Sequence, residues 1–219
     1  MLVELMWSGL LLIGGYLLGS IPTGYWMGRL LKGIDIREQG SGSTGATNVL
    51  RTLGKGPAIM VLLVDVLKGV GAIALIKIFY SLTGISLLPE NWQPWLIALA
   101  AFSAVLGHSK SIWINFTGGK SVATGLGVLL AMSWSVGLAT FGIFGLVLAL
   151  SRIVSLSSIA AAIAVSVLMI FLGEPLPYQL FAGVAALYVI LRHRSNIGRL
   201  LAGTEPRIGQ PLAQQVKDN

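Results

Sequence analysis

Three short polar segments carry most of the side chains in this chain that could do chemistry. In each of them, glycines stand beside hydroxyl or cationic side chains. Glycine can adopt a positive φ and bring backbone N–H groups close to a ligand, and such N–H groups together with Lys or Arg bind anions. Singly, each segment also fits a solvated loop. Together they predict a phosphate site made of 40–51 (GSGSTGATNVLR), 108–124 (HSKSIWINFTGGKSVAT) and 193–205 (HRSNIGRLLAGTE).

Several enzyme classes need residues that this chain lacks at the required spacing. The GGKS stretch at 118–121 resembles part of a P-loop, but Ile114 stands where that motif has its first glycine, which argues against an ATPase. Neither His108 nor His193 is followed by Asp five residues later, as in the catalytic base arrangement of many glycerolipid acyltransferases, and no G-x-S-x-G motif occurs. These absences favour a chemistry that needs no activated protein nucleophile.

Metal ions, cofactors and nucleic acid are not expected as partners. The chain has no cysteine, so a thiolate metal site is impossible, and its two histidines have no cluster of ligands around them. The net charge of +7 could indicate nucleic-acid binding, but the composition points elsewhere. Hydrophobic residues make up 55% of the chain and charged residues 11%, against roughly 25% charged in soluble domains. We therefore expect a membrane protein.

Apolar stretches of about 20 residues predict the membrane spans. The first of them is expected to be retained, because Glu4 stands where a signal peptide has Lys or Arg. The predicted spans are 5–27, 57–79, 92–107, 153–172 and 178–191.

The stretch 122–151 contains 30 residues without a charge and could form one tilted helix or two short ones. Lys and Arg occur on both sides of it, and such residues favour the cytoplasmic side. Both ends should therefore be inside, which requires two passes of about equal length with a turn near Ser133–Ser135. The predicted fold class is an all-α integral membrane protein, a bundle of seven transmembrane helices with the N-terminus outside and the C-terminus cytoplasmic.

We expect residues 1–205 to form a single membrane-embedded domain and 206–219 to be a polar tail. Asp65 and Lys68 lie inside the second predicted span, where ionisable residues often mark functional sites. Three residues apart on a helix, they can also pair with each other. A structural pair and a supporting role for the site both remain open.

The three polar segments, in this order, closely resemble the signature segments of the bacterial acyl-phosphate-dependent glycerol-3-phosphate acyltransferases, the PlsY family. GSIPTG at 19–24 and Gly107-His108 are also similar to that family, and the resemblance extends from about Leu5 to Glu205. Two positions depart from the family pattern. Ser43 stands where Asn is usual, and Ser121 stands where Gly is usual, so the backbone beside Lys120 is expected to differ slightly.

The resemblance implies an enzyme that moves a fatty acyl group from acyl phosphate to the 1-position of sn-glycerol 3-phosphate. The products are lysophosphatidic acid and phosphate, in the first step of phospholipid synthesis. It also implies no cofactor, a multi-pass location in the bacterial cell (inner) membrane, contact with membrane lipid, and an association with the enzyme that forms acyl phosphate. A catalyst for this reaction mainly holds two anionic substrates in line and screens their repulsion, which fits a site without carboxylates.

The resemblance also implies roles for individual residues. Ser41, Arg51, Lys120 and Asn196 are expected on the phosphates. His193 is expected to orient the attacking hydroxyl or accept its proton, with the substrate's own phosphate as the alternative base. Thr47 and Asn48 are expected to brace the first loop, and Glu205 to pair with Arg or cap a backbone group. The full set of further substrate-binding residues is Gly42, Ser43, Gly45, Thr47, Asn48, His108, Gly118, Gly119, Ser121, Arg194 and Glu205.

Two other functions remain as alternatives. A small-anion transporter would also bind phosphate through glycines and cations, but transporters often place the site at the bilayer midplane between inverted repeats, and no repeat is visible here. An alcohol phosphatidyltransferase needs a metal held by carboxylates, and the sequence has no Asp cluster.

Overall fold

The computed structural model describes residues 1–83 and 87–209, and these are almost entirely helical. Within them, the only pairing of extended backbone is an isolated bridge between Ser111 and Thr117. The elements are α1 (Leu2–Ser20), α2 (Thr23–Lys32), η1 (Ile36–Glu38), α3 (Ala46–Leu53), α4 (Lys55–Thr83), η3 (Glu90–Trp92), α5 (Gln93–Ser109), η4 (Ile112–Ile114), α6 (Val122–Met132), α7 (Trp134–Ser151), α8 (Val154–Phe171), α9 (Leu176–Arg192) and α10 (Arg194–Leu201).

Within the described residues, 4 helical stretches are long and apolar enough to cross a membrane. They are Leu2–Lys32, Lys55–Thr83, Trp134–Ser151 and Val154–Phe171, while α6 and α9 are apolar but shorter. Large apolar side chains such as Leu63 and Phe171 lie exposed on the outer faces of these helices, which suits a surface that meets lipid. The predicted all-α membrane class agrees with these helices.

The first predicted span is not a continuous helix. α1 ends at Ser20 and α2 begins at Thr23, so the helix expected over 5–27 is interrupted at Ile21 and Pro22. Pro22 causes the break, because its ring has no N–H and crowds the carbonyl of the preceding turn. The freed carbonyl of Ile21 accepts hydrogen bonds from the Thr23 amide at 3.1 Å and from Lys68 Nζ at 3.0 Å.

The stretch 122–151 is divided at Ser133, as predicted from the charges around it. The two helices are unequal, however, with 11 residues in α6 and 18 in α7. Ser133 Oγ donates to Glu174 Oε1 at 2.5 Å and caps the start of α7. Lys77 Nζ donates to the carbonyl of Ala131 at 2.6 Å. Polar side chains therefore satisfy the backbone groups where the short helix ends.

Glycines bring α4 and α6 into close contact. A Cβ on Gly69 would lie 2.2 Å from the carbonyl oxygen of Thr124, and one on Gly127 would lie 1.9 Å from that of Val66. Any larger residue would force these two helices apart. The close approach fixes the start of α6, which contains the last residues of the polar segment 108–124.

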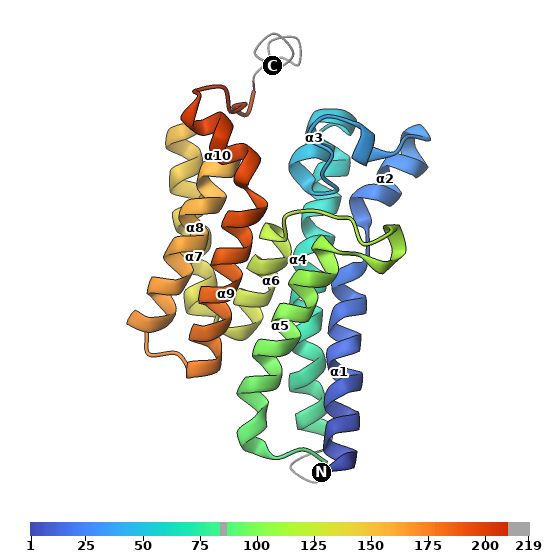
Figure 1. The fold of residues 1–219 in the computed structure, drawn as a ribbon, viewed down its shortest axis with the longest axis vertical. Helices are drawn as coiled ribbons and strands as arrows, with labels where there is room; N and C mark the ends of the chain where they lie inside the picture. The colour runs from blue at the N-terminus through green and yellow to red at the C-terminus, as the bar shows by residue number, and fades with distance from the viewer. Residues whose placement is uncertain (84–86, 210–219) are drawn as a thin grey trace.

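The three polar segments gather toward one end of the molecule (Figure 1). In this view α3 and α10 lie at the top, the segment after α5 lies in the upper half, and the N-terminus lies at the bottom. The helices α4 to α9 run alternately down and up between the two ends. The bundle thus brings the three polar segments, which are far apart in the sequence, toward the same end of the molecule.

Ordered packing continues past the expected domain boundary at Glu205. The amide of Ile208 donates to the carbonyl of Arg152 at 2.8 Å, and Pro206 lines a cavity between the helices. The rest of the predicted tail, 210–219, lies outside the described residues.

Candidate active site

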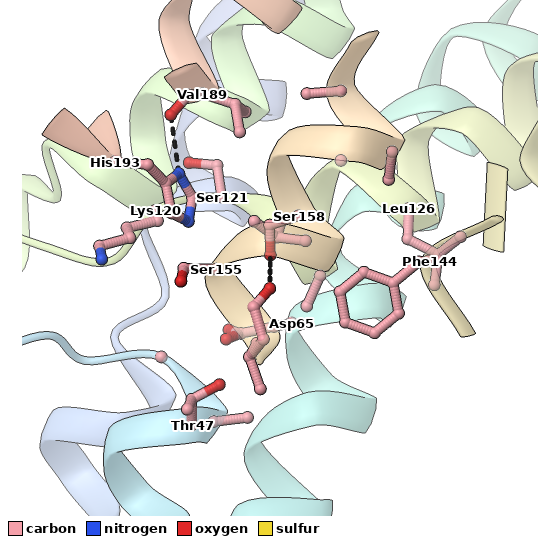
Figure 2. Close-up of a pocket in the computed structure, with 18 of the residues that line it drawn as sticks. Thr47, Asp65, Lys120, Ser121, Leu126, Phe144, Ser155, Ser158, Val189 and His193 are labelled. Atoms are coloured by element: carbon pink, nitrogen blue, oxygen red, sulfur yellow. Dashed lines mark hydrogen bonds between the residues drawn. The ribbon is translucent and has the colours of Figure 1, made fainter. Parts of the chain in front are cut away.

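A cavity of about 280 Å³ lies between the helices at this end of the bundle. Residues of α3 to α10 line it, together with loop residues at 41–45, 120–121, 193 and 205–206. Lys120, His193 and Ser155 lie on one side of it and Leu126 and Phe144 on the other (Figure 2). The cavity therefore has a polar end and an apolar end.

The structure brings most of the predicted site residues to this cavity. All five predicted catalytic residues line it. So do seven of the eleven predicted substrate-binding residues: Ser43, Gly45, Thr47, Asn48, His108, Ser121 and Glu205. Gly42, Gly118, Gly119 and Arg194 are not among its lining residues.

Asn48 organises the first polar segment. Its Nδ2 donates to the carbonyls of Gln39 and Ser43, each at 2.9 Å, and of Ile36 at 3.1 Å, and its Oδ1 accepts from the Ser41 amide at 2.9 Å. This geometry matches the expected bracing role. Because backbone groups already occupy the whole amide, the placement of Asn48 as a substrate ligand is not supported.

Gly40 and Gly42 adopt the positive φ values expected of this loop, +56° and +68°. A Cβ on Gly40 would lie 2.4 Å from Asn48 Oδ1. These glycines let the loop fold around the Asn48 amide, which leaves the hydroxyl of Ser41 at the cavity. The first segment is thus a folded loop around the Asn48 side chain, and this fold determines where its polar groups lie.

The second segment uses its glycines differently. Gly118 and Gly119 do not have positive φ. They lie against the end of α5, where a Cβ would come within 2.1 Å of the carbonyl oxygen of His108 or of its Nε2, respectively. The Nη2 of Arg192 also donates to the Gly119 carbonyl at 3.0 Å. These two glycines therefore serve close packing, and our expectation that they open the backbone through positive φ is wrong.

Ser121 has a positive φ of 62°, as do Asn115 and Phe116 earlier in this segment, which explains why glycine suits position 121. Its Oγ lies 2.6 Å from Ser109 Oγ and 2.8 Å from the Val105 carbonyl. These hydrogen bonds hold the residue in a conformation that L-residues seldom adopt. Ser121 thus fixes the turn that sends Lys120 toward the cavity.

Glu205 connects the residues of the third segment. Its Oε1 accepts from Asn196 Nδ2 at 2.6 Å and from Ser155 Oγ at 2.7 Å, and its Oε2 accepts from Arg199 Nε at 2.7 Å. Asn196 Oδ1 accepts in turn from Lys120 Nζ. The expected pairing of Glu205 with an arginine is confirmed. Its carboxylate also fixes which side of the Asn196 amide faces Lys120.

Burial changes the protonation of two groups at the polar end. It lowers the pKa of Lys120 to about 8 and that of His193 to about 4. His193 Nδ1 lies 2.7 Å from the Val189 carbonyl (Figure 2), and because a carbonyl only accepts, Nδ1 carries the proton. His193 is therefore neutral at pH 7, with Nε2 free to accept a hydrogen bond.

The expectation of a site without carboxylates is wrong, because both Glu205 and Asp65 line the cavity. Asp65 Oδ1 lies 2.8 Å from Lys68 Nζ, which confirms the predicted pair, and 3.6 Å from His108 Nδ1. The proximity to His108 was missed because the two residues are 43 positions apart in sequence. The only sequence feature that pointed to Asp65 as a site residue was its position, as an ionisable residue, inside an apolar span.

Sequence reasoning also missed Ser155 and Ser158, which line the cavity from the first turns of α8. Two hydroxyls at the start of an otherwise apolar span could have identified them. Within the described ranges, no group of three or more His, Asp and Glu side chains is placed to hold a metal ion.

The far end of the cavity is apolar. α6 and α7 contribute Leu126, Leu129, Phe141 and Phe144, and α8 and α9 contribute a series of alanines with Val165 and Phe181. One cavity therefore offers cations and hydrogen-bond donors at one end and hydrocarbon surface at the other. Such a site suits a ligand with a phosphate and a long apolar chain.

Known proteins resemble the chain over most of its length. A family model described as glycerol-3-phosphate acyltransferase matches residues 9–203. A glycerol-3-phosphate acyltransferase of Nostoc sp. (strain PCC 7120 / SAG 25.82 / UTEX 2576) is 63% identical over 217 residues, which cover 96% of each chain. One of Acaryochloris marina (strain MBIC 11017) is 59% identical over 223 residues, 97% of each.

Two solved structures are also similar. The glycerol 3-phosphate form of PlsY (YgiH), an integral membrane glycerol 3-phosphate acyltransferase, superimposes with a TM-score of 0.83 at 38% identity and covers 92% of this chain and 96% of its own. Its lysophosphatidic acid form gives a TM-score of 0.80 at 36% identity, with 96% and 97% covered. These relatives give no support to a small-anion transporter.

Proposed function

This chain belongs to the glycerol-3-phosphate acyltransferase family, and we propose that it takes its acyl group from acyl phosphate and acylates the 1-position. It is an integral membrane enzyme that acylates glycerol 3-phosphate in phospholipid synthesis. The observation that carries the proposal is the two-ended cavity, in which Arg51, Lys120 and His193 meet an apolar channel.

The polar end has the groups that two phosphates require. Arg51 and Lys120 supply positive charge, and Ser41 and Ser155 supply hydroxyls. Lys120 already donates to Asn196, and this neutral partner can be exchanged for a phosphate oxygen without separating an ion pair. Charge-assisted hydrogen bonds of this type are stronger than neutral ones. The cations thereby offset the repulsion between two anionic substrates.

In the proposed reaction, the 1-hydroxyl of glycerol 3-phosphate attacks the carbonyl carbon of acyl phosphate. A C–O bond forms to the glycerol oxygen, and the bond from the carbonyl carbon to the phosphate oxygen breaks. The products are 1-acyl-glycerol 3-phosphate and inorganic phosphate. Because acyl phosphate is a mixed anhydride, the protein needs to supply mainly alignment and charge stabilisation.

The proton of the attacking hydroxyl goes to the departing phosphate. An imidazole with a pKa of about 4, as His193 has, is a weak base at neutral pH. Phosphate monoesters have a second pKa of about 6, and a phosphate group becomes more basic as it leaves the carbonyl carbon. His193 Nε2 instead accepts a hydrogen bond from the substrate hydroxyl and orients it.

The proposed topology has seven spans, formed by α1 and α4 to α9. The N-terminus is outside and the polar end of the cavity is cytoplasmic, because the connections at that end carry most of the Lys and Arg residues. This orientation fits a bacterial inner membrane and a water-soluble acceptor from the cytosol. A single domain that ends near residue 205, and an association with the enzyme that forms acyl phosphate, stay predictions.

The chain contains no cysteine, so single-cysteine variants can test the topology without background labelling. Ser43→Cys and Lys110→Cys should react with an impermeant maleimide only from the cytoplasmic side, and Glu90→Cys only from the other side. Labelling of positions 90 and 110 from the same side would contradict the seven-span arrangement.

The donor is tested with purified protein, labelled glycerol 3-phosphate and three donors: palmitoyl phosphate, palmitoyl-CoA and palmitoyl acyl carrier protein. We expect lysophosphatidic acid to form from palmitoyl phosphate without ATP or added metal. Turnover with palmitoyl-CoA alone, after contaminating acyl phosphate has been removed, would overturn the proposed donor.

A further inference from the structure

We propose that the apolar end of the cavity measures the length of the donor's acyl chain and that Val165 and Phe181 set the limit. This inference rests on the proposed function, because it requires an acyl chain as the occupant. It concerns which acyl-chain lengths the enzyme prefers. Neither the reaction nor the phosphate site determines that preference.

The depth of the cavity follows from the helices that line it. On α8, the lining runs from Ser155 beside Glu205 down to Val165, which is about 15 Å at about 1.5 Å per residue. On α9, it runs from His193 down to Phe181, or about 18 Å. The two helices thus give similar depths, each measured from the polar groups to the last lining residue.

The lining ends where the packed core of the bundle begins. Val165, Phe181 and Leu129 line the cavity and are themselves buried. The next residues down, Met169 and Tyr178, belong to the same hydrophobic core and are not among the lining residues. The cavity therefore has a floor of closely packed side chains.

Small side chains keep the channel open above this floor. The wall between the polar groups and Phe181 consists largely of alanines on α8 and α9: Ala161, Ala162, Ala182, Ala185 and Ala186. Because a methyl side chain fills little space, these positions leave room for hydrocarbon. The change from alanines to Val165 and Phe181 marks where that room ends.

This arrangement predicts a maximum in chain-length preference. Each methylene that enters the channel adds favourable burial, worth about fourfold in kcat/KM. A chain that is longer than the channel must displace packed side chains, which interiors resist. Preference should therefore rise with chain length and then fall once the chain reaches the floor.

The test measures kcat/KM for saturated acyl phosphates from decanoyl to stearoyl. Phe181→Ala removes the ring at the floor and should shift the preferred donor to a longer chain, raising the ratio of stearoyl to myristoyl transfer by about tenfold or more. The matched control is Phe171→Ala, because Phe171 is 82% exposed at the end of α8 and does not line the cavity. Its chain-length profile should match that of the unmodified protein.

A second variant closes the channel partway down. Ala162 lies about 10 Å below Ser155 on α8, and Ala162→Leu should shift the preferred donor to a shorter chain. Opposite shifts in Phe181→Ala and Ala162→Leu would support the proposal. If either variant is folded and active but changes kcat/KM for all chain lengths by the same factor, Phe181 and Val165 do not set the limit.

Failure of this inference can be distinguished from failure of the proposed donor. If the unmodified protein uses acyl-CoA and no acyl phosphate, the donor is wrong, and the same chain-length series in acyl-CoA form then tests the floor. If acyl phosphate is used but its chain-length profile is flat, the donor stands and the chain-length limit is overturned.

Discussion

Residues 40–45 and 117–121 are both glycine-rich loops at the polar end of the cavity, but their glycines meet different physical demands. In the first loop, Gly40 and Gly42 have positive φ and allow the chain to wrap around Asn48. In the second, Gly118 and Gly119 are compact residues that fit against the end of α5, and Ser121 has the positive φ. Glycine therefore has a different function in each of these two loops of similar composition. In the first it allows a positive φ, and in the second its small size allows close packing.

The largest effect is expected for Gly118→Ala, because the new Cβ would lie 2.1 Å from the backbone oxygen of His108, which cannot rotate away. The loop must shift and carry Lys120 with it. Since a displacement of about 1 Å at a site can reduce rates 100-fold, we expect kcat/KM to fall by about that factor or more. Gly142→Ala is the control, because a Cβ there meets nothing within 4 Å.

Lys120→Ala should reduce kcat/KM by about 10- to 150-fold, since a hydrogen bond to a charged group contributes about 1.5–3 kcal/mol. The protein should stay folded in detergent. Lys120→Arg should restore only part of the activity, because guanidinium and ammonium differ in shape and hydration. Near-normal kcat/KM in folded Lys120→Ala would mean that the second loop does not bind phosphate through Lys120. The comparison of the two loops would then concern their backbone structure alone.

The two segments should also differ in their dependence on pH. Because burial lowers the pKa of Lys120 to about 8, its cation is present below that pH and is lost above it. Burial also lowers the pKa of Arg51, but an arginine starts about 2 pH units or more above a lysine, so its cation persists where Lys120 loses its own. We expect kcat/KM for glycerol 3-phosphate to fall about tenfold per pH unit above pH 8. In Lys120→Arg the fall should move to higher pH. An unchanged pH profile in Lys120→Arg would mean that another group causes the fall in kcat/KM above pH 8.

The smallest effect is expected for Gly42→Ala. Forcing an alanine into positive φ costs about 1–2 kcal/mol, and the new Cβ would lie 3.1 Å from the Arg37 carbonyl. We expect KM for glycerol 3-phosphate to rise by less than tenfold. Gly42→Asn should retain more activity than Gly42→Ala, because asparagine tolerates positive φ. Gly118→Asn should give no such recovery, which separates the two functions of glycine directly.

The sequence was sufficient for features that depend on composition or charge. The apolar runs predicted the membrane class, and the placement of Lys and Arg predicted the helix break that the structure has at Ser133. The break at Pro22 was missed even though the residue type was visible, because an apolar run was given more weight than a proline within it.

Features that depend on contacts between residues far apart in the chain could not be predicted from the sequence. Nothing local shows that Asp65 lies near His108, or that the Cβ of a residue at 118 would meet the backbone of α5. The floor of the cavity is likewise formed by α6, α8 and α9 together. Such contacts arise only when helices pack, so the sequence predicted most of the residues that line the cavity but not the contacts that these residues make.

The depth of the cavity also limits where new lipid enters the membrane. A channel of about 15–18 Å matches about half of a hydrocarbon core roughly 30 Å thick. In the proposed orientation, donor and product both occupy the cytoplasmic leaflet, and no part of the reaction reaches the opposite one. Under this proposal each turnover would add lipid to one leaflet alone, and an expanding membrane would need a separate process that moves lipid across the bilayer.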